Sequence, residues 1–186
     1  HPLMMASGRV FMAWLSDSTQ GPADRMVRST LPYKLLDGST VADNWDDLTD
    51  GTLQHAIDVD ENGAATDEAN WGDADCRDAI PAAPVRTQTN AAGTFRDSAI
   101  GPHRPCQDWT TSVIGGESLW YGRATGPFST SVLWTESCEG DEDCDRVALL
   151  YCIEQQVDPN RQGLPQPGSQ PSGAFPLGTM GLASSI

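Results

Sequence analysis

An acidic segment in the first half of the chain has the spacing of oxygen ligands that a calcium ion prefers. Its candidate ligands are Asp58, Asp60, Asn62 and Asp67. Calcium takes six to eight hard oxygen ligands, and Gly63 stands where a calcium loop makes its sharp turn. The twelfth position of an EF-hand needs glutamate, and here it is Ala69. The segment therefore predicts a calcium site, with an acidic surface turn as the alternative.

Two of the six tryptophans lie in polar, glycine-rich surroundings where an indole ring can stack on a sugar. These are Trp71 and Trp120. Tryptophans at strand spacing more often belong to a hydrophobic core. We therefore predict ligand stacking at Trp71 and Trp120, and core positions for most of the others.

The remaining chemistry-bearing residues do not form a catalytic pattern. No Ser-His-Asp or Cys-His order stands out among the three histidines and five cysteines. Cysteines in a loop-rich chain are typical of disulfide-held extracellular domains, and an odd number leaves one over. The sequence thus favours a non-catalytic protein that is secreted, periplasmic or on the cell surface.

The charge of the chain narrows the classes of partner. The 186 residues include 26 acidic and 11 basic side chains, for a formal net charge of -15. Such a field repels phosphate backbones, so nucleic-acid binding is excluded, whereas basic surfaces, cations and neutral glycans remain open. No apolar run is long enough to span a bilayer. Because the chain starts at His1, we expect a removed leader or a longer precursor.

Local patterns predict short elements separated by long loops. Hydrophobic runs, turn signals and helix caps indicate a strand at 9–15, a helical turn at 23–27, a hairpin at 33–42, a helix at 44–51, strands at 109–113, 119–121 and 132–134, and a buried final strand at 147–153. The hairpin signal is Asp37-Gly38 between two apolar runs. Residues 58–105 are polar and rich in turn formers, which indicates loops with short strands at most.

The composition changes near residue 155, which divides the chain into a domain at 1–155 and a tail at 156–186. The tail is rich in proline and glycine and has no charged side chain beyond Arg161. Such a segment cannot bury a core of its own and is expected to be extended and mobile. It is either a linker or an arm, residues 157–186, that docks on a partner subunit.

An ordered set of short segments resembles a bacterial branch of the C-type lectin-like domains, the branch similar to the endostatin domain. The segments are Phe11–Ser18, Ala23–Arg25, Asp37-Gly38, Val41–Trp45, Asp47–Gly51, Asp60–Gly63, Cys106–Thr110 and Leu150–Gln155. The resemblance spans most of residues 10–155. It implies an α+β, C-type lectin-like fold held by disulfides, with the tail as an extended C-terminal arm. Many members of this branch are secreted or surface proteins of unassigned function.

The resemblance also implies a pattern of disulfides. It pairs Cys106 with Cys144 and places a second bridge between the first helix and Cys152. No cysteine precedes Cys76, so Cys152 is expected to be unpaired or bonded outside this chain. With those assignments, Cys76 and Cys138 are expected to pair as an extra loop staple. The calcium motifs of sugar-binding members are missing from the chain.

These observations favour a non-catalytic subunit for recognition or assembly outside the cytoplasm. Its expected partners are proteins that contact the long loops and residues 157–186. The alternative is a lectin-like module that binds glycans or surfaces, with calcium as the possible cofactor. A metalloenzyme is the least favoured function.

Overall fold

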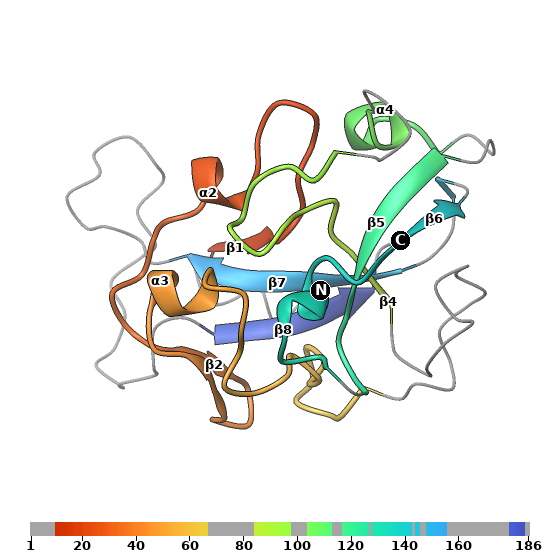
Figure 1. Ribbon diagram of the computed structural model, residues 1–186. Helices are drawn as coiled ribbons and strands as arrows, with labels where there is room; N and C mark the ends of the chain where they lie inside the picture. Colours follow the sequence, from red (N-terminus) through yellow and green to blue (C-terminus); the bar gives the residue numbers. More distant parts are fainter. Residues whose placement is uncertain are drawn as a thin grey trace.

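The computed structural model describes residues 10–66, 84–97, 104–112, 117–126, 128–142, 144–145, 148–155 and 179–184. In these residues a mixed sheet carries the fold, and short helices lie beside it (Figure 1). The α+β class and the Cys106–Cys144 disulfide are therefore confirmed. No helix in the described ranges is long and apolar enough to cross a membrane.

The sheet contains eight strands in the described part of the chain. They are β1 (Val10–Ala13), β2 (Tyr33–Leu35), β3 (Thr40–Ala42), β4 (Pro84–Arg86), β5 (Glu117–Arg123), β6 (Cys138–Glu142), β7 (Leu149–Gln155) and β8 (Thr179–Ser184). Their order is β3-β2-β8-β7-β4-β5-β6, and β1 also pairs with β7. Figure 1 shows β7 crossing the middle of the molecule between β1 and β8.

Strand β7 is the centre of the sheet because it pairs with β1, β4 and β8, and its residues alternate between the core and the outer face. Leu149, Tyr151, Ile153 and Gln155 are buried, and the residues between them are partly exposed. This period of two is the signature of a strand with one buried face. The predicted strand at 147–153 is confirmed from Leu149 onward, but it is not the last strand, because β8 follows it.

The short helices are α2 (Pro22–Arg25), α3 (Trp45–Leu48), α4 (Cys106–Trp109) and the 3-10 turn η3 (Val132–Trp134). Helix α3 starts where expected, since the Asn44 side chain accepts a hydrogen bond from the Asp47 backbone N–H. The hairpin of β2 and β3 is also confirmed, and Gly38 adopts a φ of 94° in its turn.

Two of the predicted strands are wrong. Val132–Trp134 forms a 3-10 turn because the Ser131 side chain caps it and the Trp134 N–H bonds to the Ser131 carbonyl at 2.8 Å. Residues 109–112 of the predicted strand at 109–113 form no strand, and Val113 lies outside the described residues. Trp109 instead ends α4, and its N–H bonds to the Pro105 carbonyl.

Helix α4 is a left-handed turn. The φ angles of Cys106, Gln107, Asp108 and Trp109 are 46°, 52°, 58° and 63°. Left-handed geometry costs an L-residue roughly 1–2 kcal/mol, so the surroundings must hold the turn in place. They do so through the Cys106–Cys144 disulfide, the hydrogen bond from the Ser18 N–H to Asp108, and the bond from Trp109 Nε1 to the Ser16 carbonyl.

Aromatic rings form the main core against the inner face of β7. The ring centroid of Trp14 lies 5.0 Å from that of Trp134 and 5.9 Å from that of Trp45, and Trp134 contacts Tyr151 at 5.5 Å. These tilted contacts are the geometry that aromatic pairs prefer. The core positions predicted for most tryptophans are confirmed for these three.

The tail contributes a strand to the sheet of its own chain. Strand β8 is antiparallel to β7 on one side and parallel to β2 on the other. Over Thr179–Ser184 the tail is therefore hydrogen-bonded within the molecule, where the sequence predicted an extended, mobile segment. Residues 156–178 lie outside the described residues.

Candidate functional site

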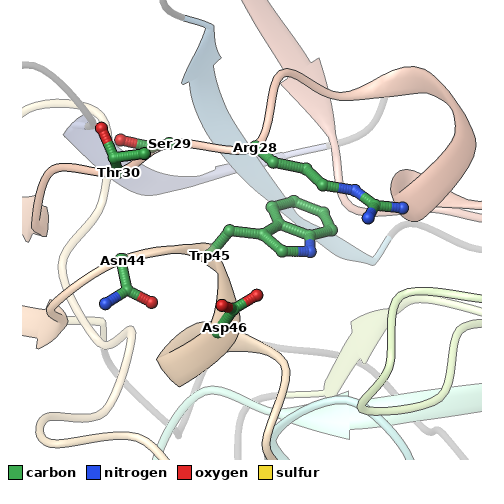
Figure 2. Close-up of a pocket in the computed structure, with 6 residues that line it drawn as sticks. All are labelled: Arg28, Ser29, Thr30, Asn44, Trp45 and Asp46. Atoms are coloured by element: carbon green, nitrogen blue, oxygen red, sulfur yellow. The ribbon is translucent and has the colours of Figure 1, made fainter.

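A small polar pocket lies between the loop that follows α2 and the first turn of α3. It has a volume of about 240 Å³. Its lining residues are Arg28, Ser29, Thr30, Asn44, Trp45 and Asp46, shown in Figure 2. Two short segments distant in sequence thus supply a cation, an anion, an amide, two hydroxyls and an indole.

Backbone hydrogen bonds hold the two segments together. The Trp45 N–H donates to the Ser29 carbonyl at 2.8 Å, which joins the start of α3 to the loop after α2. Ser29 is buried, and its hydroxyl donates to the Leu31 carbonyl at 2.9 Å. The pocket walls are therefore anchored to the core through the backbone.

Trp45 forms the apolar wall of the pocket. Its side chain packs in the aromatic core beside Trp14 and is only 5% exposed. The Arg28 guanidinium carbon lies 5.8 Å from the Trp45 ring centroid, at cation–π distance, and Arg28 Nη2 donates to the Ala23 carbonyl at 3.1 Å. Figure 2 shows the Arg28 side chain extended along the indole.

Several polar groups of the pocket are not used by the fold. Among the described residues, nothing hydrogen-bonds to the Thr30 hydroxyl, the Asn44 amide nitrogen or the Asp46 carboxylate. Thr30 and Asp46 are exposed, and Asn44 is half-buried. Because unused donors and acceptors beside an aromatic wall fix the orientation of small ligands, this arrangement can bind a polar molecule.

The pocket was not found from the sequence. The segment Val41–Trp45 was noted as part of a family resemblance, and Asn44 as a helix start, but nothing connected them to Arg28. The two segments are joined by the hydrogen bond from the Trp45 N–H to the Ser29 carbonyl, and no pattern in the sequence indicates this hydrogen bond.

The predicted calcium ligands do not come together as a metal site in the part of the chain that the structure describes. Asp60 Oδ1 accepts hydrogen bonds from the backbone N–H groups of Asn62 and Ala64, at 2.8 Å and 2.9 Å. Burial acts to raise the pKa of Asp60, but these hydrogen bonds outweigh it, and the pKa lies below its ordinary value. The segment is a tight turn that satisfies Asp60 internally.

The other predicted ligands have different surroundings. The Asn62 amide donates to Asp60 Oδ2 at 3.4 Å, Asp58 Oδ1 faces the His55 ring at 3.8 Å, and Asp67 lies outside the described residues. No group of three His, Cys, Asp or Glu side chains with metal-binding geometry occurs within the described ranges. A calcium site stays a prediction that would need residues beyond those ranges.

The two predicted stacking tryptophans have different outcomes. Trp120 is half-buried on β5, and the Arg96 guanidinium lies 4.7 Å from its ring centroid. Arg96 also pairs with Glu136, whose Oε2 is 3.5 Å from Arg96 Nε. One face of Trp120 is thus covered by a side chain of the same molecule. Trp71 lies outside the described residues.

The cysteines agree with the expected pairing where they are described. Cys106 and Cys144 are bonded, and Cys138 belongs to a second disulfide. Its predicted partner, Cys76, lies outside the described residues. Cys152 is a free, half-buried thiol on the outer face of β7. Burial raises the pKa of Cys152 to about 11, and the Glu61 carboxylate adds to the increase.

Comparisons with known proteins give no relative: no family model matches the chain, and neither the curated proteins nor the solved structures include a significant match. The function therefore has to be argued from the geometry of the molecule itself.

Proposed function

We propose that this protein is a non-catalytic recognition module that binds a small neutral saccharide unit in the Arg28–Trp45 pocket. The observation that carries the proposal is the set of unused polar groups, on Thr30, Asn44 and Asp46, beside the wall of Trp45. The proposal takes up the glycan-binding function that the sequence left as an alternative.

The chemistry of the pocket complements a ring that carries hydroxyl groups. The Asp46 carboxylate accepts hydrogen bonds from hydroxyls, while the Asn44 amide and the Arg28 guanidinium donate to hydroxyl oxygens. The Thr30 hydroxyl can do either. The small exposed part of Trp45, 5% of the residue, adds an apolar contact for a sugar ring.

Size and charge restrict the ligand further. A volume of about 240 Å³ is below the roughly 300–1,000 Å³ typical of drug-sized ligands, so the pocket suits one ring and not a long chain. The charges of Arg28 and Asp46 offset each other, and the net charge of -15 opposes anionic ligands. A neutral sugar is therefore favoured over an acidic one.

Binding is favoured over catalysis because the pocket lining offers too few reactive groups. It contains one carboxylate, Asp46, and no histidine or cysteine. General acid–base chemistry on a glycosidic bond uses a pair of carboxyl groups. The disulfides support a place in an oxidising, extracytoplasmic compartment, which agrees with a lectin-like module of the kind the sequence resembles.

A second candidate function is a subunit of a surface or periplasmic assembly, docked through the loops and the tail. The observation that favours it is β8, which shows that the uncharged tail has the pairing capacity of a strand. In this structure β8 pairs with β2 and β7 of its own chain.

The test is a glycan array probed with the full chain, with and without calcium, followed by affinity measurements on any bound glycan. Asp46→Asn should weaken binding about 10- to 100-fold, since hydrogen bonds to charged groups contribute about 1.5–3 kcal/mol. Asp43→Asn is the matched control, because Asp43 is an exposed aspartate beside α3 that does not line the pocket.

Two results would reject the proposal. The first is an array without a bound glycan in either condition. The second is a glycan that binds equally well to the wild type and to Asp46→Asn, which would place the sugar elsewhere on the molecule.

A further inference from the structure

Strand β8 is an interior strand, although it comes from the end of a tail that is remote in sequence from its neighbours. Leu149 to Ile153 of β7 pair with Ser184 to Met180 of β8, and Lys34 and Leu35 of β2 pair with Thr179 and Met180. Removing β8 would expose the facing backbone groups of both neighbouring strands. Such exposed edges are ready to pair with another strand.

The same strand links two parts of the sheet. Among the described strands, β2 pairs only with β3 and β8, so the β2–β3 hairpin joins the rest of the sheet through β8. The β2–β7 slot, defined here as the facing edges of β2 and β7, is therefore a specific acceptor for a strand with the backbone register of residues 179–184.

The distribution of charge makes the tail the part of the molecule best able to reach a second copy. Every charged side chain lies at or before Arg161, and the net charge of -15 belongs to that portion. Two such bodies repel each other within a Debye length, about 8–10 Å at physiological ionic strength. The uncharged segment beyond Arg161 does not contribute to that repulsion.

The connection is long enough for exchange. Residues 156–178 separate β7 from β8, and a chain of this length spans at most about 80 Å when fully extended. A strand tethered in this way competes with the strand of another molecule at an effective concentration on the order of millimolar. The closed monomer should thus prevail in dilute solution and give way as the local concentration rises.

We propose that the β2–β7 slot accepts β8 from a second copy of this chain, so that two molecules exchange their C-terminal strands. The exchange is reciprocal and closes as a two-fold dimer, because each molecule donates one strand and offers one slot. Each exchanged strand keeps the hydrogen bonds that it makes in the monomer. The proposal is independent of the ligand pocket and concerns the kind of assembly that the tail supports.

The free thiol Cys152 offers a direct test, because its cross-strand partner in β8 is Gly181. In the full-length Gly181→Cys variant, oxidation with a copper catalyst should bond residue 181 to Cys152, since directly paired residues lie within disulfide range. The other described cysteines are already in disulfides. The linkage reports whether β8 pairs with its own β7 or with that of another molecule.

Samples of Gly181→Cys would be partly unfolded and refolded without reductant, at about 10 µM and at about 1 mM, and then oxidised. We expect a linkage within one chain in the dilute sample and a rising fraction of covalent dimers in the concentrated one. A mixture of isotopically heavy and light chains identifies the linked peptides. Light scattering on the wild type, treated identically, should show the same rise in dimer.

Ala13→Cys is the matched control. Ala13 of β1 is the cross-strand partner of Cys152 on the side of β7 opposite β8. The neighbouring pair is hydrogen-bonded, since the Trp14 N–H donates to the Tyr151 carbonyl, so Ala13 and Cys152 form a closely spaced pair without hydrogen bonds. Because β1 is not exchanged, this variant should form links within one chain at every concentration.

Three results would overturn the proposal. One is a Gly181→Cys linkage that stays within one chain at all concentrations. Another is the absence of any 181–152 linkage. The third is an equal yield of dimers from Ala13→Cys and Gly181→Cys, which would indicate random cross-linking.

Discussion

Replacing Gly122 with alanine tests how closely β5 and η3 approach in the core. A Cβ atom at residue 122 would lie 1.9 Å from the Trp134 carbonyl oxygen and 2.8 Å from the Thr135 Cα. Both are backbone atoms, so no side chain can rotate to make room. The two segments would have to separate by roughly 1 Å, and cores resist such overpacking.

The displacement also breaks a specific hydrogen bond. The Trp134 carbonyl accepts from the Tyr151 hydroxyl at 2.8 Å, deep in the core. Burial raises the pKa of Tyr151 well above its ordinary value, so the hydroxyl remains a donor. Overpacking costs about 1–3 kcal/mol, and leaving a buried hydrogen-bonding group unsatisfied costs a similar amount. We expect Gly122→Ala to lower the free energy of unfolding by about 2–6 kcal/mol, the sum of the two costs.

Urea denaturation followed by tryptophan fluorescence measures this change, and the melting temperature should fall by roughly 4–24 °C. Gly38→Ala is the control, since Gly38 has a φ of 94° and open space around its Cβ position. It reports the conformational cost alone, about 1–2 kcal/mol. A Gly122→Ala variant no less stable than this control would refute the steric argument.

A double-mutant cycle with Tyr151→Phe tests the second step of the reasoning. Tyr151→Phe alone should cost about 1–3 kcal/mol, because it removes the donor to the Trp134 carbonyl. In the Gly122→Ala background the bond is already broken, so the same change should cost almost nothing. Additivity within about 0.5 kcal/mol would show that the two sites are independent and that the proposed displacement does not occur.

Two further predictions concern titrating groups. The Ser18 N–H and the Arg104 guanidinium lower the pKa of Asp108 below its ordinary value of 3.8. The ionised carboxylate therefore stabilises the folded protein above pH 3.8, and this contribution is lost as the pH falls through the lower pKa of the folded state. Asp108→Asn should therefore be less stable than the wild type at neutral pH, with a difference in urea midpoint that shrinks below pH 3.8; a constant difference would contradict this. Because the pKa of Cys152 is raised from 9.0 to about 11, its alkylation by iodoacetamide at pH 8 should be about 100-fold slower than that of a cysteine in a short peptide, and an equal rate would show that the thiol is not buried.

Local sequence patterns were reliable where a few adjacent residues carry the whole signal. The Asp37-Gly38 turn formed its hairpin, and Asn44 capped its helix, because the hydrogen bonds that close the turn and the cap join residues at most four apart. The alternation along Leu149–Gln155 likewise reported a strand with one buried face. In each case backbone geometry and side-chain type pointed to the same structure.

The failures occurred where distant residues decide the outcome. Val132–Trp134 has the composition of a strand, yet the Ser131 cap and the packing of Trp134 in the core form a 3-10 turn. The pocket joins Arg28 to Asp46 through a backbone bond between Ser29 and Trp45, which no local pattern encodes.

In the acidic segment and in the tail, neighbouring backbone groups decide what the composition leaves open. The calcium site stays a prediction, and among the described residues the Asp60 carboxylate accepts hydrogen bonds from N–H groups of its own turn, which agrees with the alternative of an acidic surface turn. The composition of the tail indicated a segment without structure, but β2 and β7 supply the pairing that the tail lacks when alone. A strand enclosed by two others depends on its neighbours more than on its own propensity.

The place of β8 has a consequence for biosynthesis. The ribosome makes β2 and β7 before residues 179–184, so the sheet lacks an interior strand until that segment has been made. Pairing across such a sequence distance is slow compared with local hairpins and turns. Until residues 179–184 emerge, the facing edges of β2 and β7 have no strand between them, and the β2–β3 hairpin has no partner that joins it to β7. Closure of the sheet is therefore a late event in the folding of this chain.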